Sequence, residues 1–253
     1  MRQRLIEWLV NACHYYNLRT ETLHLTVMCV DRYLAAEIVT KETLLLLGVA
    51  CLHLTSKYRE KEYPSVDELV RATDKLYTSE CILEVGDMAI KTLGGSIRKW
   101  PTSNAFSKLI LAIEPRPCIE KVSNMLTELG LHDYDMSMKY SPSLQAASAI
   151  FLAKSVVSSK PISENDWTLA MQVVTKKTYP EAFNSILHLH RLLSRSLDMD
   201  TMTIWKYYER DTPRKIVSKT IPLPLMKSEK TRNLETLVCK LWSRKVPILV
   251  KST

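Results

Sequence analysis

Residues 2–33 read RQRLIEWLVNACHYYNLRTETLHLTVMCVDRY, and apolar side chains recur along them three or four positions apart. Side chains at this spacing lie on one face of an α-helix. The pattern runs through residues 2–16, is interrupted at Asn17 and Thr20, and resumes over residues 21–36. The stretch therefore predicts two consecutive amphipathic helices joined by a short turn.

Helical spacing continues along the chain, and the alternation typical of β-strands is nearly absent. Residues 44–54, LLLLGVACLHL, are apolar on every side, which places that helix inside a bundle. Further helices are expected over residues 66–72, 79–93, 101–112, 118–129, 142–157, 164–174, 180–197 and 201–209. Aligning Lys154 with Lys57 pairs the two most apolar helices, which suggests a duplicated unit of roughly 100 residues.

Composition excludes several classes of protein. The five glycines form no clustered loop of the kind that holds nucleotide phosphates, which argues against an α/β nucleotide-binding fold. The six cysteines form no CxxC pair, and we expect them to be reduced, mostly core residues of an intracellular protein. The longest apolar run, residues 44–52, is far shorter than the roughly 20 residues that cross a bilayer. Much of the net charge of +8 follows Lys206 and is interpreted as a solvated basic tail.

The opening stretch resembles the cyclin box at every constrained position, namely Arg2, Leu5, Trp8, Leu9, Leu18, Leu23, Thr26, Val27, Cys29, Val30, Asp31, Arg32 and Tyr33. Residues 44–60 resemble the central cyclin helix, which ends in Ser-Lys-aromatic. The resemblance continues in residues 101–106, PTSNAF. Residues 140–149, YSPSLQAASA, resemble the third helix of the second box in A- and B-type cyclins. The resemblance covers about residues 1–220.

This resemblance implies an all-α protein made of tandem five-helix cyclin folds. We expect an N-terminal cyclin box at residues 1–98, a C-terminal box at 99–198, and an extra helix with a basic tail at 199–253. Cyclins bind and activate a cyclin-dependent protein kinase in cell-cycle control, which implies a place in the nucleus and cytoplasm. Because such a subunit acts by differential binding, no enzymatic activity, catalytic residue or cofactor is expected.

The resemblance also implies a kinase-binding surface. Lys57, at the end of the central helix, matches a lysine that contacts backbone carbonyls near the kinase's regulatory helix. Leu54 and Tyr58 flank it, and Ile90 is a further apolar contact. The family's partner for this lysine is a glutamate early in the fifth helix, but counting from Lys57 places Gly86 there. We expect this departure to remove one anchor and to weaken the helix.

Met1, Leu5 and Trp8 match residues of a substrate-docking patch that binds Arg-x-Leu motifs in the family. Asn11 stands where the family carries the acidic residue expected to receive the motif's arginine. Two interpretations therefore stay open. The patch binds Arg-x-Leu substrates or inhibitors, or Trp8 simply packs against its neighbours.

Two further pairs of polar residues are interpreted as structural. Arg2 and Asp31 match an internal ion pair of cyclins, which fixes how two helices pack and has no binding role. His188 and His190 are two positions apart on a predicted helix, so they point in nearly opposite directions and cannot share a metal ion.

Two other functions compete with kinase activation. Cyclin folds also occur in transcription factors that bind promoter DNA, and a net charge of +8 suits phosphate contacts. The Ser-Lys-aromatic helix end and the stretches at 101–106 and 140–149 argue against that class, so nucleic acid is not the expected partner. The second alternative is a divergent cyclin that acts as a scaffold without activating a kinase, which Gly86 favours.

Overall fold

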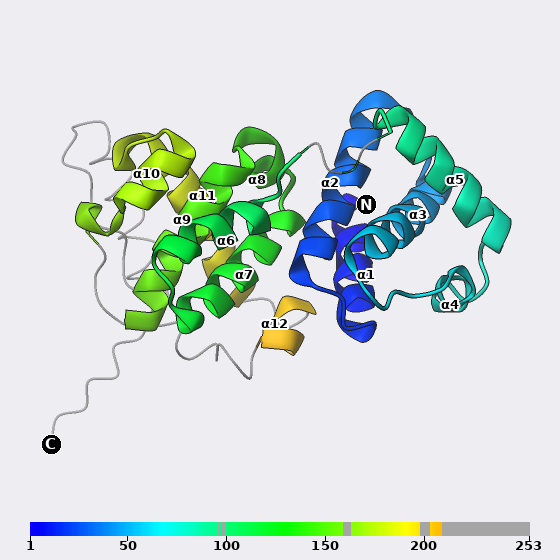
Figure 1. The fold of residues 1–253 in the computed structure, drawn as a ribbon, viewed down its shortest axis with the longest axis horizontal. Helices are drawn as coiled ribbons and strands as arrows, with labels where there is room; N and C mark the ends of the chain where they lie inside the picture. The colour runs from blue at the N-terminus through cyan, green and yellow to red at the C-terminus, as the bar shows by residue number, and fades with distance from the viewer. Residues whose placement is uncertain (96, 98–99, 159–162, 198–202, 209–253) are drawn as a thin grey trace, which may run out of the picture.

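The structure is a computed structural model, and it describes the chain except for residues 96, 98–99, 159–162, 198–202 and 209–253. The predicted basic tail and Cys239 therefore lie outside the described residues. Within the described residues all regular secondary structure is helical. Figure 1 shows two helical bundles side by side, blue to cyan and green to yellow, with α12 beneath their junction.

The N-terminal unit contains α1 Arg2–Tyr15, α2 Thr20–Ala36, α3 Lys41–Arg59, α4 Val66–Ala72 and α5 Ser79–Thr92. Residues 46–53 of α3 are all buried, which confirms the prediction of a central helix. Threonines begin two of these helices: the Thr40 hydroxyl accepts a hydrogen bond from Thr43 N at 3.4 Å, and Thr78 accepts one from Cys81 N at 3.4 Å.

The C-terminal unit contains α6 Ser103–Ile113, α7 Pro117–His132, α8 Tyr134–Lys139, α9 Pro142–Ser158, the 3-10 turn η2 Glu164–Asp166, α10 Leu169–Thr175 and α11 Tyr179–Leu197. Its central helix is α9, where residues 144–153 are all buried. The two central helices, α3 and α9, are the helices that the alignment of Lys154 with Lys57 pairs. The prediction of a tandem all-α fold is therefore confirmed.

Two details of the C-terminal unit differ from the sequence prediction. Helix α8 was not expected, because its sequence has no apolar periodicity; it begins where the Asp133 carboxylate accepts a hydrogen bond from Met136 N at 2.6 Å. The helix expected over residues 164–174 is divided at Trp167. The Trp167 backbone is not helical, and its buried indole donates to Lys177 O at 3.0 Å.

Helix α12, Thr203–Tyr208, joins the two units. Ile204 and Trp205 are buried in the core of the C-terminal unit. On the other side, the Tyr207 ring stacks on His14 of α1 with centroids 3.8 Å apart. A segment that the sequence set apart from both boxes therefore packs against both.

The cysteines are more varied than expected. Cys13, Cys29 and Cys51 are buried, whereas Cys81 and Cys118 are exposed on α5 and α7. The expectation of core positions is therefore wrong for the last two. Each follows a helix start where the first turn faces solvent, and the helical spacing alone does not show that.

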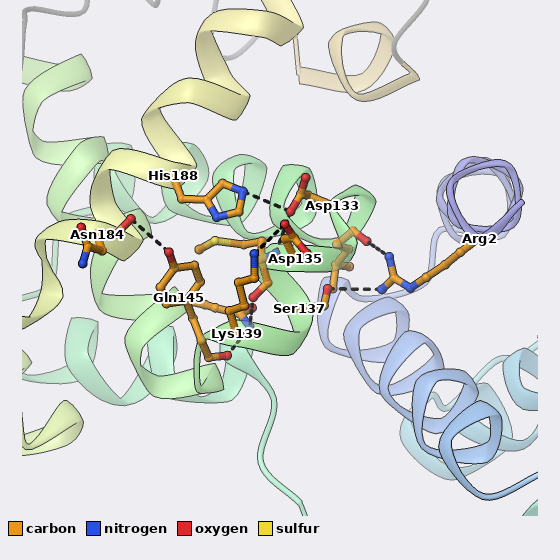
Figure 2. A network of polar contacts seen from close by, with 11 residues as sticks. Arg2, Asp133, Asp135, Ser137, Lys139, Gln145, Asn184 and His188 are labelled. Carbon is orange, nitrogen blue, oxygen red and sulfur yellow. Dashed lines mark hydrogen bonds and ion pairs between the residues drawn. The ribbon is translucent and has the colours of Figure 1, made fainter. Parts of the chain in front are cut away.

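Arg2 connects the two units as well as two helices of the first. Its Nε and Nη2 atoms donate to the two Asp31 carboxylate oxygens, each at 2.8 Å. Nη1 donates to Leu131 O at 2.7 Å, near the end of α7, and Nη2 donates to Ser137 Oγ of α8 at 3.2 Å. Figure 2 shows Arg2 reaching across from α1 towards Ser137. The pair thus has a role that the sequence did not show, which is to orient the C-terminal unit.

Two more polar contacts link α2 to the start of α6. Thr102, which caps α6, donates its hydroxyl proton to Glu21 at 2.8 Å. The Ser103 hydroxyl lies 3.0 Å from Nδ1 of His24, a side chain that is 2% exposed. Burial and, secondarily, the charge of Lys108 lower the pKa of His24 to about 3. The imidazole is therefore neutral within the folded protein.

We expect Arg2→Met to lower the free energy of unfolding by about 2–4 kcal/mol, because Asp31 then loses its partner in a setting where both side chains are only 13% exposed. Urea unfolding measures this loss. The control is Lys139→Met, which removes an ion pair with Asp135 whose side chains are 61% and 54% exposed. That change should cost much less, because water screens a pair that is this exposed. Equal losses in the two variants would contradict the role assigned to Arg2.

Stability should also fall as the medium is acidified below the ordinary histidine pKa of about 6.5. In the unfolded chain His24 takes up a proton there, whereas the folded protein resists protonation down to about 3. The unfolded state binds more protons in this window, so acid favours unfolding. Urea unfolding at about pH 7 and about pH 5 should show this loss, and His24→Gln should reduce it. An unchanged pH dependence in the variant would show that His24 is not responsible.

Candidate functional site

The C-terminal end of α3 and the neighbouring helix α5 carry the residues expected to bind a kinase. Lys57 and Tyr58 are exposed, and Leu54 and Ile90 are half-buried. Leu54 lies between the exposed end of α3 and α5, where it faces Gly86. The structure therefore brings Leu54 and Gly86 together between α3 and α5, and the contact of Lys57, Tyr58 and Ile90 with a kinase stays a prediction.

Lys57 differs from its counterpart in the C-terminal unit. Among the residues that the structure describes, no carboxylate pairs with Lys57, whereas Lys154 on α9 pairs with Glu114 at 3.2 Å. Lys154 Nζ also lies 3.4 Å from Asp166 O. Equivalent positions on the two central helices thus carry a neutralised lysine in one unit and an exposed lysine in the other.

The position of Gly86 explains how α3 and α5 approach each other. Gly86 is buried, and a Cβ atom added there would lie 3.6 Å from the Leu54 side chain, which is ordinary van der Waals contact. Leu54 therefore covers the site where the family's glutamate is expected. Gly86 is buried and offers no side chain to a partner, so its place among the kinase contacts stays a prediction.

Glu60 anchors the end of α3 to α2, and sequence reasoning missed it. Its carboxylate accepts a hydrogen bond from Arg19 N at 2.9 Å and another from the Thr22 hydroxyl. It also pairs with Arg19 Nε at 3.4 Å, and its side chain is 7% exposed. Glu60 thereby satisfies a free N–H at the start of α2 and holds in place the helix end that carries Lys57. No local sequence signal indicates a contact across so many residues.

His53 lies one turn before Lys57 and adds no charge to this helix end. It is 7% exposed, and burial followed by the charge of Lys57 lowers its pKa. The ring stays neutral and packs edge-on to Tyr63, with centroids 6.2 Å apart. Lys57 and Arg59 are therefore the cations that the last turn of α3 presents to solvent.

The predicted docking patch on α1 is only partly a surface. Met1 is 62% exposed and Trp8 is half-buried, but Leu5 is 5% exposed and belongs to the core of the N-terminal unit. Leu5 packs so closely on α3 that a Cβ added at Gly48 would lie 2.5 Å from its Cδ1 atom. Leu5 is therefore a core residue, and its assignment to an exposed patch is wrong.

The remaining polar residues form structural contacts. His188 lies 3.2 Å from Asp133, the residue that caps α8, and Figure 2 shows it pointing towards that carboxylate. His190 is 5% exposed, in the core of the C-terminal unit. Within the described residues no group of three or more His, Cys, Asp and Glu side chains is placed to hold a metal ion. No described helix has the length and apolar character needed to cross a membrane.

Comparison with known proteins places this geometry in a family. Residues 1–98 match the family model "Cyclin, N-terminal domain", and residues 101–223 match "Cyclin, C-terminal domain". A chain of the yeast RNA Pol II CTD kinase CTDK-1 complex has the same fold, with a TM-score of 0.63 and 11% identity over 94% of this chain and 75% of that one.

Two relatives indicate the subfamily. Cyclin-A1-4 of Oryza sativa subsp. japonica is 37% identical over 198 residues, which cover 76% of this chain and 54% of the rice protein. The G2/mitotic-specific cyclin-A of Drosophila melanogaster is 30% identical over 219 residues, which cover 85% of this chain and 43% of the fly protein. The chain thus spans about half the length of these relatives. With both domain models matched along most of its length, it belongs to the cyclin family and is similar to the A-type members.

Proposed function

We propose that this chain binds a cyclin-dependent protein kinase and activates it in cell-cycle control. The observation that carries the proposal is the end of α3, where Lys57 and Tyr58 are exposed on a helix that Glu60 anchors. The names of the A-type relatives support a role in the cell cycle, and the yeast kinase complex supports a kinase as partner for this fold.

The proposed mechanism is differential binding and involves no bond chemistry in this chain. A subunit that binds the active conformation of a kinase more tightly than the inactive one shifts the kinase population towards activity. The helical units supply a rigid surface for this purpose, because α3 is buried along its middle and only its end is presented to a partner. On this basis we propose a regulatory subunit and not an enzyme.

A second candidate is a cyclin-type scaffold that binds a kinase weakly or does not activate it. Gly86 favours this candidate, since it leaves Lys57 without the carboxylate that the family places beside it. The two candidates differ in the effect of the chain on kinase activity, which the following experiments measure.

Pull-down with a panel of purified cyclin-dependent kinases, followed by histone phosphorylation, should show binding and activation. Lys57→Ala should weaken the complex by about tenfold, or roughly 1.4 kcal/mol, because it removes an exposed cation from the end of α3. The control is Lys41→Ala, an exposed lysine at the opposite end of α3. The proposal fails if no kinase binds, or if the two variants bind alike. Binding without increased phosphorylation would support the scaffold.

Gly86→Ala and Gly86→Glu test the missing anchor. The alanine should raise the free energy of unfolding by about 0.5–1 kcal/mol, because it improves helix propensity and its Cβ has room beside Leu54. It should leave kinase affinity unchanged. The glutamate should strengthen kinase binding several-fold by returning a carboxylate to the vicinity of Lys57. Equal affinities for the two variants would show that the carboxylate is not what the surface lacks.

We also propose that the chain acts in the nucleus and the cytoplasm, as its proposed role in cell-cycle control requires. Imaging of a tagged full-length protein through the cell cycle tests this. Exclusion from the nucleus at every stage would contradict it.

A further inference from the structure

A groove of about 580 Å³ lies between α1, α4 and α12. One wall is α1, with Trp8 and Tyr15, and the opposite walls come from α4 and from α12, which carries Tyr207. The floor is held together by the side chain of Asn11, whose Oδ1 accepts the Tyr207 hydroxyl proton at 2.8 Å. The groove thus exists because α12 packs back onto the N-terminal unit.

Aromatic rings give the groove an apolar lining. Tyr15 is 81% exposed and meets Tyr16 edge-on, with ring centroids 5.0 Å apart. Tyr16 donates its hydroxyl proton to Glu68 O at 3.2 Å, and Tyr207 is held by its stack on His14. Rings held in this way provide contact area for the apolar side chains of a partner. They lose little conformational entropy on binding, because they are already ordered.

The groove presents two exposed cations and a single carboxylate. Arg71 and Lys206 are exposed on its walls, and within the described residues neither forms an ion pair. The one acidic lining residue, Glu68, already accepts hydrogen bonds from Ser65 N at 2.7 Å and Ser65 Oγ at 2.8 Å. The Asn11 Nδ2 atom donates to Glu7 O at 3.0 Å, so both polar atoms of this side chain are held by hydrogen bonds.

We propose that this groove binds a short acidic segment of a partner protein, in which Asp or Glu alternates with apolar side chains. The carboxylates would pair with Arg71 and Lys206, and the apolar side chains would pack on Trp8 and Tyr15. An Arg-x-Leu segment fits less well, because its arginine would face both Arg71 and Lys206, and Glu68 is the one carboxylate of the lining. The chain's own residues 209–253 are rich in Lys and Arg, so the same cations repel them.

Nucleic acid is the other anionic partner to consider. Backbone recognition of a single strand needs a track of cations that follows successive phosphates. This groove offers two cations with the Glu68 carboxylate beside them, so a compact acidic peptide is the better match. The proposal does not rest on kinase binding, since the groove and the end of α3 share no residue.

Fluorescence polarisation with the full chain tests the proposal. The probe is a labelled ten-residue peptide of alternating Glu with Leu or Phe, and the control peptides replace every Glu with Gln or contain an Arg-x-Leu motif. We expect the acidic peptide to bind at least tenfold more tightly than either, with an affinity that falls as salt is added. The double change Arg71→Glu with Lys206→Glu should reduce this affinity at least tenfold. The matched control, Lys61→Glu with Lys91→Glu, alters net charge equally on exposed residues outside the groove.

Several results would overturn the proposal. Equal losses of affinity in the two double variants would show that the peptide is attracted by net charge and not by this groove. Tighter binding of the Arg-x-Leu peptide would show that the groove keeps the docking preference of the family. Displacement of the probe by a peptide of residues 209–253 would make the tail the occupant, and stronger displacement by a single-stranded oligonucleotide would favour nucleic acid. Thermal melting of each variant verifies that it is folded, and Arg71→Gln with Lys206→Gln provides a milder second pair. No kinase is present in this assay, so a negative result would not contradict the proposed regulation of a kinase.

Discussion

The arrangement of this molecule depends on a single guanidinium group. Arg2 uses the fixed fork of its N–H donors to bind both oxygens of Asp31 and, in addition, Leu131 O and Ser137 Oγ of the C-terminal unit. A lysine cannot reproduce this geometry, because its ammonium is a point charge on a flexible stem. Leu131 O lies near the end of α7, where free carbonyls and the helix dipole both favour a cation. One side chain therefore sets the packing of α1 on α2 and the placement of α7 and α8 against them.

The rest of the inter-unit contact is consistent with this constraint. Glu21, His24 and their partners Thr102 and Ser103 occupy the junction of α2 with α6, and α12 closes it from the other side through Tyr207. These are buried polar contacts, which contribute less to stability than apolar packing but permit only one relative orientation. This orientation also fixes the wall that α12 adds to the groove at α1.

The sequence predicted the helices well and the site only in part. The central helices α3 and α9 follow from apolar runs that must be buried, and threonines mark the starts of α3, α5 and α6. Helix α8 depends on one capping contact and has no periodic signal. The burial of Leu5 could not be foreseen, since it depends on Gly48 of another helix. Glu60 and Tyr207 act across more than thirty residues, and helical spacing carries no information at that range.

The two units show how a duplicated fold can keep its architecture and change its surface. Both central helices end near a lysine, yet Lys154 is neutralised by Glu114 of its own unit while Lys57 finds no carboxylate among the described residues. Gly86 is part of this difference, because it places no carboxylate on α5 where that helix faces Leu54. A lysine already paired within its own unit would have to give up that partner before it could bind another chain, which costs affinity. An exposed lysine on an anchored helix end has no such cost. This physical difference supports the proposal that a kinase would bind at the end of α3, in the N-terminal unit.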